Sequence, residues 1–304
     1  TPESNGYYLG SDGAYYMKAT ATVTSDSENY ADFKDGTSIT EGTEYYFKME
    51  KLKWRILTEN YEGSGNALIV CDTIVDIVNY QSNYVSRSYY YATDEDGAIL
   101  VDNSATPGKG VDSNHQVYAN NYEHSEIREY LNGTFYDTAF NDEEKSYIVT
   151  TTVDNSFESI FGSYTADSGY TEDTFNYECR DTQDKVFLLS LSDVNNTEYG
   201  FKDSYEAIIG NDWSTDFDTA RLFYTSDFSR AMGAATLTEA LSEQLTSMGI
   251  SEEDIPLYLG SGAGWLRSPY DVSDCAFTVF IGDYGINNVD YDGYGVVPAL
   301  QIQL

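Results

Sequence analysis

The chain has 304 residues, of which 41% are hydrophobic and 15% aromatic, and 29 of them are tyrosines. Acidic chains that stay disordered are poor in aromatic residues, so this composition indicates a folded protein with a sizeable core. The 51 acidic and 16 basic residues give a net charge of −35. This charge argues against nucleic acid and against anionic membrane surfaces as partners, because phosphate contacts require clustered Lys and Arg. No run reaches the ~20 apolar residues of a membrane-spanning helix.

The N-terminal part of the chain is polar and predicts short strands. The pairs around Tyr7–Tyr8 and Ala14–Met17 flank the turn Gly10–Gly13, which is a hairpin signal. A further short strand is expected at Ala19–Val23. We expect residues 1–42 to form a β-rich extension that packs on a main domain of residues 43–304.

The main domain begins with three strand-like segments. Residues 44–50 and 52–57 alternate with roughly period two, and the apolar run 67–72 follows a Gly-rich loop. This pattern predicts a β-meander with one face buried.

A long polar insertion spans residues 80–120 and offers few apolar positions for a core. We therefore expect surface loops, which at this length are often functional or mobile. The insertion carries Tyr80, Tyr84, Tyr89, Tyr90 and Tyr91.

Helical patterns follow the insertion. Residues 125–131 begin at an N-cap-type Ser125 and are expected to end at Asn132–Gly133, with Ile127, Tyr130 and Leu131 on one face. Residues 141–148 begin at Asn141 with three acids that suit the helix dipole.

Strand and helix patterns continue toward the C-terminus. Residues 183–190 predict a strand, and residues 237–248 predict an amphipathic helix that ends at Gly249. The expected apolar side of this helix comprises Leu237, Ala240, Leu241, Leu245 and Met248. Strands, then helices, then strands again predict an α+β fold rather than alternating βαβ units.

Several separate motifs occur in order along the chain. They are Tyr46-Phe47-Lys48, Lys53 to Leu57, Ser125 to Asn132, Phe135 to Phe140, Glu143-Glu144-Lys145, Thr151 to Asn155, Asp181 to Ser190, Trp265 to Pro269 and Gly295 to Leu300. Taken together, over roughly residues 43 to 304, they resemble the DUF6273 family of bacterial proteins, which is common in gut Firmicutes.

The family looks like part of the C-type-lectin-like group, which includes formylglycine-generating enzymes and the variable proteins of diversity-generating retroelements. The resemblance implies a small twisted antiparallel sheet, two central helices, long loops and a C-terminal strand beside the N-terminal strands. This chain departs from the family pattern at Val297, where the family usually has Arg, and at Gly264, where it often has Trp. If that Arg anchors a loop by hydrogen bonds, the anchor is missing here.

The C-terminal loops are the candidate ligand-binding surface. Tyr gives a large, stiff contact area that can stack on sugar rings, and Asn and Asp add adaptable hydrogen bonds. Asp, Asn and Gly also populate ordinary turns, so turn chemistry is the competing interpretation. In the variable-protein relatives the same region binds ligand, which favours recognition. The candidates are Tyr270, Asp271, Asp274, Asp283, Tyr284, Asn287, Asn288, Asp290, Tyr291, Asp292 and Tyr294.

Catalytic signals are weak. The two histidines, His115 and His124, lie in the polar middle of the chain, and nothing pairs either with a nucleophile and a carboxylate. Formylglycine-generating chemistry needs active-site cysteines near the C-terminal region, where only Cys275 lies. A pair of acids could serve a glycoside hydrolase, but among 51 acids suitable pairs arise by chance. We therefore expect a non-enzyme.

The cysteines and acids give only weak signals for disulfides and metal sites. Cys71 and Cys275 lie in apolar runs that favour buried free thiols, and with Cys179 they allow one disulfide at most. Asn288–Gly293 copies the first half of a calcium-binding EF-hand loop, but Ala299 stands at the twelfth position; Thr93–Gly97 fails similarly. We expect no cofactor and keep Ca²⁺ as the alternative.

Structural roles are expected for several residues of the C-terminal motifs. Trp265, Leu266 and Pro298 are expected in the core, and Arg267 is expected to pair with a buried carboxylate. The sequence thus predicts a secreted or cell-surface binding protein that recognises a glycan or protein ligand. The alternatives are an acid-pair glycoside hydrolase and a structural or adhesive module without a small ligand.

Overall fold

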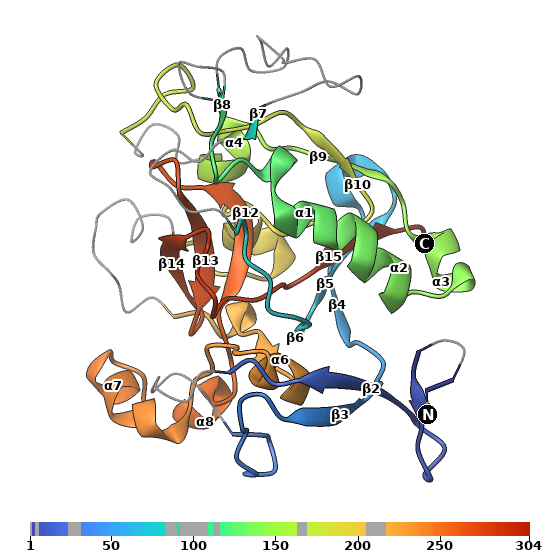
Figure 1. Cartoon of the computed structure of the whole chain (residues 1–304). Helices are drawn as coiled ribbons and strands as arrows, with labels where there is room; N and C mark the ends of the chain where they lie inside the picture. The colour runs from blue at the N-terminus through green and yellow to red at the C-terminus, as the bar shows by residue number, and fades with distance from the viewer. Residues whose placement is uncertain are drawn as a thin grey trace.

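The computed structural model describes residues 2–3, 6–23, 32–82, 90–91, 109–111, 116–162, 169–204 and 217–304. The fold is α+β, with several small sheets and short helices, as the order of elements predicted (Figure 1). None of the helices in these ranges is both long and apolar enough to cross a membrane.

The N-terminal sheet has the strand order β1-β2-β3, with β1 at Tyr8–Leu9, β2 at Tyr15–Thr20 and β3 at Glu44–Lys48. The predicted hairpin is confirmed, because β1 and β2 pair antiparallel across the Gly10–Gly13 turn. Since β3 pairs with β2, this sheet crosses the expected boundary between residues 42 and 43. Phe47 of β3 packs edge-on against Phe228 at 5.4 Å, which joins the sheet to the rest of the fold.

The central sheet has the order β15-β5-β4, with β4 at Trp54–Thr58, β5 at Ala67–Cys71 and β15 at Ala299–Ile302. The C-terminal strand therefore pairs with an early strand, as the family resemblance implied. The predicted meander is wrong, because β3 and β4 belong to different sheets. All five residues of β5 are buried, so this strand is covered on both faces rather than one.

The first helical segment is longer than predicted. α1 (Glu126–Tyr130) continues through a π-helix (Leu131–Phe135) into α2 (Tyr136–Ala139), so the helix does not end at Asn132–Gly133. The Asn132 side chain explains the difference. Instead of capping a helix end, it accepts from the Lys185 N–H and donates to the Val186 carbonyl, which ties the helix to the neighbouring segment. The Ser125 cap is confirmed.

The second predicted helix is confirmed as α3 (Asp142–Tyr147), which begins with a capping box. The Asn141 side chain accepts from the Glu144 N–H, and the Glu144 carboxylate accepts from the Asn141 N–H. Each side chain thus satisfies a backbone group that the helix leaves open.

Replacing Asn141 with Ala is expected to destabilise the protein by about 1 kcal/mol, because the cap of α3 is lost. Asn141→Ser, which retains a capping oxygen, is expected to recover most of this loss. Urea unfolding of the three proteins measures the difference. Equal stability of all three would mean that α3 is held by packing alone.

The C-terminal amphipathic segment forms a 3₁₀ turn (Glu239–Leu241) followed by α7 (Ser242–Ser247). Leu237, Leu241 and Leu245 are buried in a second apolar cluster, as predicted. Ala240 and Met248 are exposed, contrary to prediction. The 3₁₀ turn has three residues per turn, so it rotates the face that a continuous α-helix would have presented.

The remaining elements are short and connect these parts. The strands are β6 (Thr73–Ile74), β7 (Tyr90–Tyr91), β8 (Gln116–Val117), β9 (Thr151–Val153), β10 (Thr182–Asp184), β11 (Tyr224–Thr225), β12 (Gly264–Pro269), β13 (Cys275–Phe280) and β14 (Asp283–Asn288). The α-helices are α4 (Phe157–Phe161), α6 (Asp227–Ala231) and α8 (Ile255–Tyr258), and the other 3₁₀ turns are Tyr61–Gly63, Tyr122–His124, Asp193–Asn195, Thr197–Tyr199 and Thr219–Arg221. The predicted strand at 183–190 is thus only three residues long and begins at Thr182.

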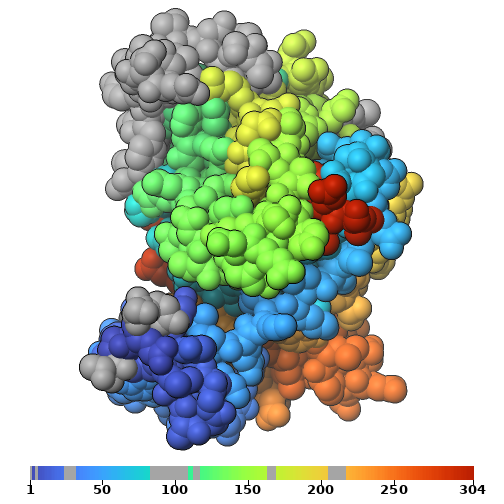
Figure 2. Space-filling model, turned by 90° about the vertical axis from the view of Figure 1, so that its right-hand side faces the viewer, coloured from blue at the N-terminus to red at the C-terminus, as the bar shows by residue number. Residues whose placement is uncertain are grey.

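The main core lies between the central sheet, β12–β14 and the α1–α2 helix. Trp265, Leu266 and Pro298 are buried there, as predicted. Tyr80 was expected in a surface insertion, but it is fully buried, and its hydroxyl lies 2.9 Å from the Arg267 carbonyl and 3.2 Å from the Asn120 carbonyl. The rest of that insertion lies mostly outside the described residues. Figure 2 shows the green helical segment over the front, with the red C-terminus beside the light-blue residues near position 60.

Candidate functional site

The C-terminal sheet brings together two parts of the predicted surface. In the order β12-β13-β14, Cys275 at the start of β13 lies opposite Asn288 at the end of β14. The Val289 N–H donates to the Asp274 carbonyl at 2.9 Å. The loop of residues 270–274 and the segment that begins at Asn288 therefore meet at one end of this sheet, which we call the acidic end.

A buried asparagine holds the loop at the acidic end. Asn120 is 0% exposed, and its side-chain amide donates to the carbonyls of Tyr270 and Val272 in the loop and of Cys275 at the start of β13, at 2.8–3.2 Å. Its backbone N–H donates to the Ser273 carbonyl. The loop is thus wrapped around one side chain that lies 150 residues earlier in the chain.

Two tyrosines lie against the Asp271 carboxylate. The Tyr170 hydroxyl donates to it, and this hydrogen bond raises the pKa of Tyr170 to about 12. Burial raises the pKa of Tyr270, and Asp271 adds to that effect. Phenylalanines support both rings: Tyr170 stacks on Phe161 at 6.2 Å, and Tyr270 packs edge-on against Phe277 at 5.4 Å. The result is a half-exposed Tyr-Asp-Tyr group with little freedom to move.

Acids surround the half-buried Cys275 thiol. Burial, followed by the charge of Asp274 and weaker effects of Asp271 and Asp290, raises its pKa to about 11. Burial and the Asp292 charge likewise raise the pKa of Asp290. Within the described ranges, none of these four acids forms an ion pair with Lys, Arg or His. The local field is therefore negative.

The segment after Asn288 is also fixed by side-chain contacts. Asn79 donates to the Asp290 carbonyl and to Asp292 Oδ1 at 3.1 and 3.2 Å. The Tyr291 ring, which is 41% exposed, packs against Tyr294 at 4.9 Å. Tyr294 in turn contacts the buried Trp265 at 5.4 Å. Tyr291 is therefore the exposed end of an aromatic contact that reaches the core.

Two predicted residues lie elsewhere. Asp283 and Tyr284 begin β14, at the end of the sheet opposite the acidic end. Tyr284 is only 9% exposed; its hydroxyl donates to Asn195 Oδ1 at 2.7 Å, and the Arg221 guanidinium lies 4.4 Å from its ring centroid. Tyr284 is thus a core residue, because residues 283–288 form a strand and not the loop that we expected.

Three residues of the acidic end were not predicted from the sequence. They are Tyr170, Asn120 and Asn79, which come from three distant parts of the chain. Each contacts the C-terminal segments through a side-chain hydrogen bond. Nothing local in the sequence distinguishes them from other polar loop residues.

The other residues that the sequence singled out either have structural surroundings or lie outside the described ranges. The Arg267 guanidinium pairs with Asp193 at 2.6 Å, which confirms the predicted buried ion pair. Burial lowers the pKa of His124, which lies 3.7 Å from Glu123. His115 and Thr93–Gly97 lie outside the described residues.

The cysteines and acids form no recognisable redox or metal centre in the described parts of the chain. Cys71, Cys179 and Cys275 are free thiols. Burial raises the pKa of both Cys71 and Cys179 to about 12. No group of three or more His, Cys, Asp or Glu residues there is arranged to hold a metal ion.

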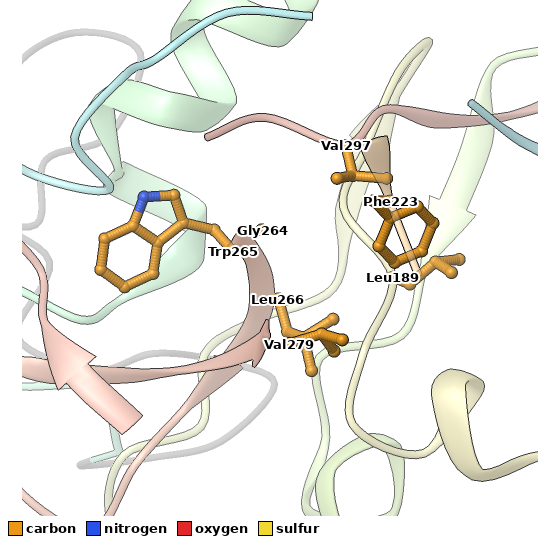
Figure 3. Close-up of a pocket in the computed structure, with 7 residues that line it drawn as sticks. All are labelled: Leu189, Phe223, Gly264, Trp265, Leu266, Val279 and Val297. Carbon is orange, nitrogen blue, oxygen red and sulfur yellow. The ribbon is translucent and has the colours of Figure 1, made fainter. Parts of the chain in front are cut away.

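A small apolar cavity lies behind β12. It is lined by Leu189, Phe223, Gly264, Trp265, Leu266, Val279 and Val297 (Figure 3). Gly264 and Val297 face each other here, because a Cβ on Gly264 would lie 2.8 Å from Val297 Cγ2. The lining has no polar side-chain cluster, so this space belongs to the packing of the core.

Comparison with known proteins identifies the family. Residues 64–304 match the family described as "Domain of unknown function (DUF6273)", so the chain belongs to that family. The match begins after β4, although β4 pairs with β5 inside the same sheet. No curated protein matches the chain. No solved structure matches it either.

Proposed function

We propose that this chain is a secreted or cell-surface binding protein that recognises a glycan or protein ligand through the acidic end of its C-terminal sheet. The observation that supports this most is the Tyr-Asp-Tyr group, in which Tyr170 and Tyr270 are held against Asp271 and backed by phenylalanines. Rigid aromatic rings give contact area at little entropic cost, and a carboxylate accepts hydrogen bonds from hydroxyl or N–H groups.

The negative charge of the acidic end limits the class of ligand that can bind there. With Asp271, Asp274, Asp290 and Asp292 near one another and unpaired with cations in the described ranges, an anionic ligand would be repelled. A neutral sugar can stack its apolar face on Tyr270 or Tyr291 and donate hydroxyls to the acids. The same acids would attract a basic protein segment.

An analogy between folds also motivates the proposal. We propose a C-type-lectin-like arrangement, because the chain combines an α+β fold with a C-terminal strand that pairs with an early strand. In the variable proteins of that group the C-terminal region is the ligand-binding face, and the acidic end lies in the same region of this chain. This step rests on analogy between folds.

Replacing Tyr270 or Tyr291 with Ala is expected to weaken ligand binding at least about tenfold, which corresponds to ~1.4 kcal/mol. The reason is the loss of a ring that is at least partly exposed and is held in place by its neighbours. Glycan and protein arrays probed with the purified chain identify a ligand, and titration of each variant measures the loss. Tyr46→Ala is the matched control, since Tyr46 is 55% exposed but lies on β3 in another sheet.

The outcomes separate the alternatives. Binding that survives both substitutions rejects the acidic end as the site. Release of sugar from a bound glycan would instead support the acid-pair hydrolase, and no binding on either array would support the structural or adhesive module. Repeating the titration with added CaCl₂ and with EDTA tests calcium; we expect equal affinity, because Asn288 and Asp292 already accept hydrogen bonds from Cys275 and Asn79.

A further inference from the structure

A largely buried lysine and a fully buried glutamate lie in contact with each other. The Lys109 Nζ atom is 2.9 Å from Glu178 Oε1, and the two side chains are 12% and 1% exposed. Lys109 Nζ also donates to the Glu172 carbonyl. Neither oxygen of the Glu178 carboxyl group makes a hydrogen bond of normal geometry within the described residues. A buried carboxyl group with so few donors requires an explanation.

The backbone holds the two residues in register. The Gly110 N–H donates to the Asn176 carbonyl at 2.8 Å, and the Gly110 carbonyl accepts from the Tyr118 N–H at 3.0 Å. Gly110 has φ +69°, and a Cβ there would lie 2.8 Å from the Glu178 carbonyl oxygen. A glycine thus allows the chain that carries Lys109 to lie directly against the chain that carries Glu178. Because the fold already holds the two groups together, a reaction between them does not require a collision of separate groups.

Little solvent reaches the pair, because the two side chains are only 12% and 1% exposed. Burial raises the pKa of Glu178, although Lys109 and the Phe157 N–H oppose this shift. A proton passed from Lys109 to Glu178 gives a neutral amine beside a neutral carboxylic acid, which is the pair of forms that can condense.

We propose that Lys109 and Glu178 are joined by an intramolecular amide bond. The Nζ lone pair attacks Glu178 Cδ, the bond between Cδ and the acid hydroxyl breaks, and that hydroxyl leaves with one proton from Nζ as water. Nothing is oxidised or reduced, and no further reactant is consumed. The Phe157 N–H faces the carboxyl group, where it can stabilise the negative charge that develops on the carbonyl oxygen. After the reaction the amide N–H keeps the Glu172 carbonyl as its acceptor.

The bond would close a loop from residue 109 to residue 178. Closing a loop of this length lowers the entropy of the unfolded chain, as a disulfide does. It would tie the segment at residue 109 to the segment at residue 178 through a linkage that reducing agents do not break.

The decisive experiment is intact mass spectrometry of the denatured full chain, which needs no variant. We expect a mass one water below the sequence mass, and a tryptic digest in which cleavage after Lys109 fails and a branched peptide joins Lys109 to Glu178. Lys109→Arg is expected to restore the full mass. Lys53 is the internal control: its Nζ lies 3.1 Å from Asp72 Oδ2, but the side chain is 82% exposed, so trypsin should cleave after it. A wild-type chain with the full sequence mass would overturn the proposal and leave an ordinary ion pair.

Discussion

Replacing Arg267 with Leu is expected to lower the free energy of unfolding by about 3–5 kcal/mol, because the change leaves the Asp193 carboxylate buried without its cation. Arg267 is 3% exposed and Nη1 lies 2.6 Å from Asp193 Oδ2. The same guanidinium also donates to the Leu188 and Asp154 carbonyls at 2.9–3.3 Å. One side chain therefore satisfies acceptors on three residues, and its loss leaves all of them without this donor.

Urea unfolding monitored by tryptophan fluorescence measures this loss. Arg267→Lys should recover little of it, since an ammonium group cannot reproduce the planar fork of five donors. The control is Lys18→Ala, which breaks an exposed pair with Glu44 and should cost under about 1 kcal/mol. Similar losses for Arg267→Leu and Lys18→Ala would show that the buried pair does not hold the core together.

Replacing Asn120 with Ala is expected to cost about 2–3 kcal/mol and to release the loop of residues 270–275. Three amide hydrogen bonds are lost at ~1 kcal/mol each. Asn120→Asp should be at least as damaging, because a carboxylate would then face three carbonyl oxygens. Ligand affinity at the acidic end should fall as the loop becomes less ordered.

Hydrogen exchange localises the effect. We expect faster exchange of backbone N–H groups in residues 270–275 of the Asn120→Ala variant, alongside the lower stability in urea. Asn176→Ala is the control, since its side chain is exposed and it should change stability by less than about 0.5 kcal/mol. If the exchange rates of this loop are the same in Asn120→Ala as in the wild type, Asn120 does not hold the loop in place.

Local signals in the sequence predicted local structure well. The Ser125 and Asn141 caps and the Gly10–Gly13 hairpin depend on neighbours within a few residues, and each is present. The C-terminal motif Trp265–Pro269 was correctly interpreted as scaffold, with Arg267 paired to a carboxylate. The α+β class followed from the order of such elements.

The β13–β14 hairpin was missed because its turn lacks the usual residues. Phe280 and Asp283 pair across the two residues Ile281 and Gly282, which both have positive φ, at 58° and 74°. Such turns favour Asn-Gly or Asp-Gly, and a β-branched residue at positive φ is rare. Ile281 packs against the second apolar cluster, which offsets part of its backbone strain. With the turn unrecognised, Tyr284 was assigned to a loop and not to the core.

The acidic end could be predicted only in part for a different reason. Tyr270, Asp271 and Asn288 are near one another because two strands of the same sheet end there. The contributions of Asn120 and Tyr170 depend on tertiary contacts across 150 and 101 positions, respectively. No periodicity or spacing in a single sequence reports contacts of that range.

The strand order β15-β5-β4 has a consequence for how the chain acquires its structure. β5, with five buried residues, needs β15 along one edge, but residues 299–302 are synthesised more than 200 positions after it. Contacts so distant in sequence form slowly, because a long loop must close first. Until then an apolar strand edge stays open to pairing with other chains. Assembly of the central sheet is therefore the stage at which this protein is most exposed to aggregation.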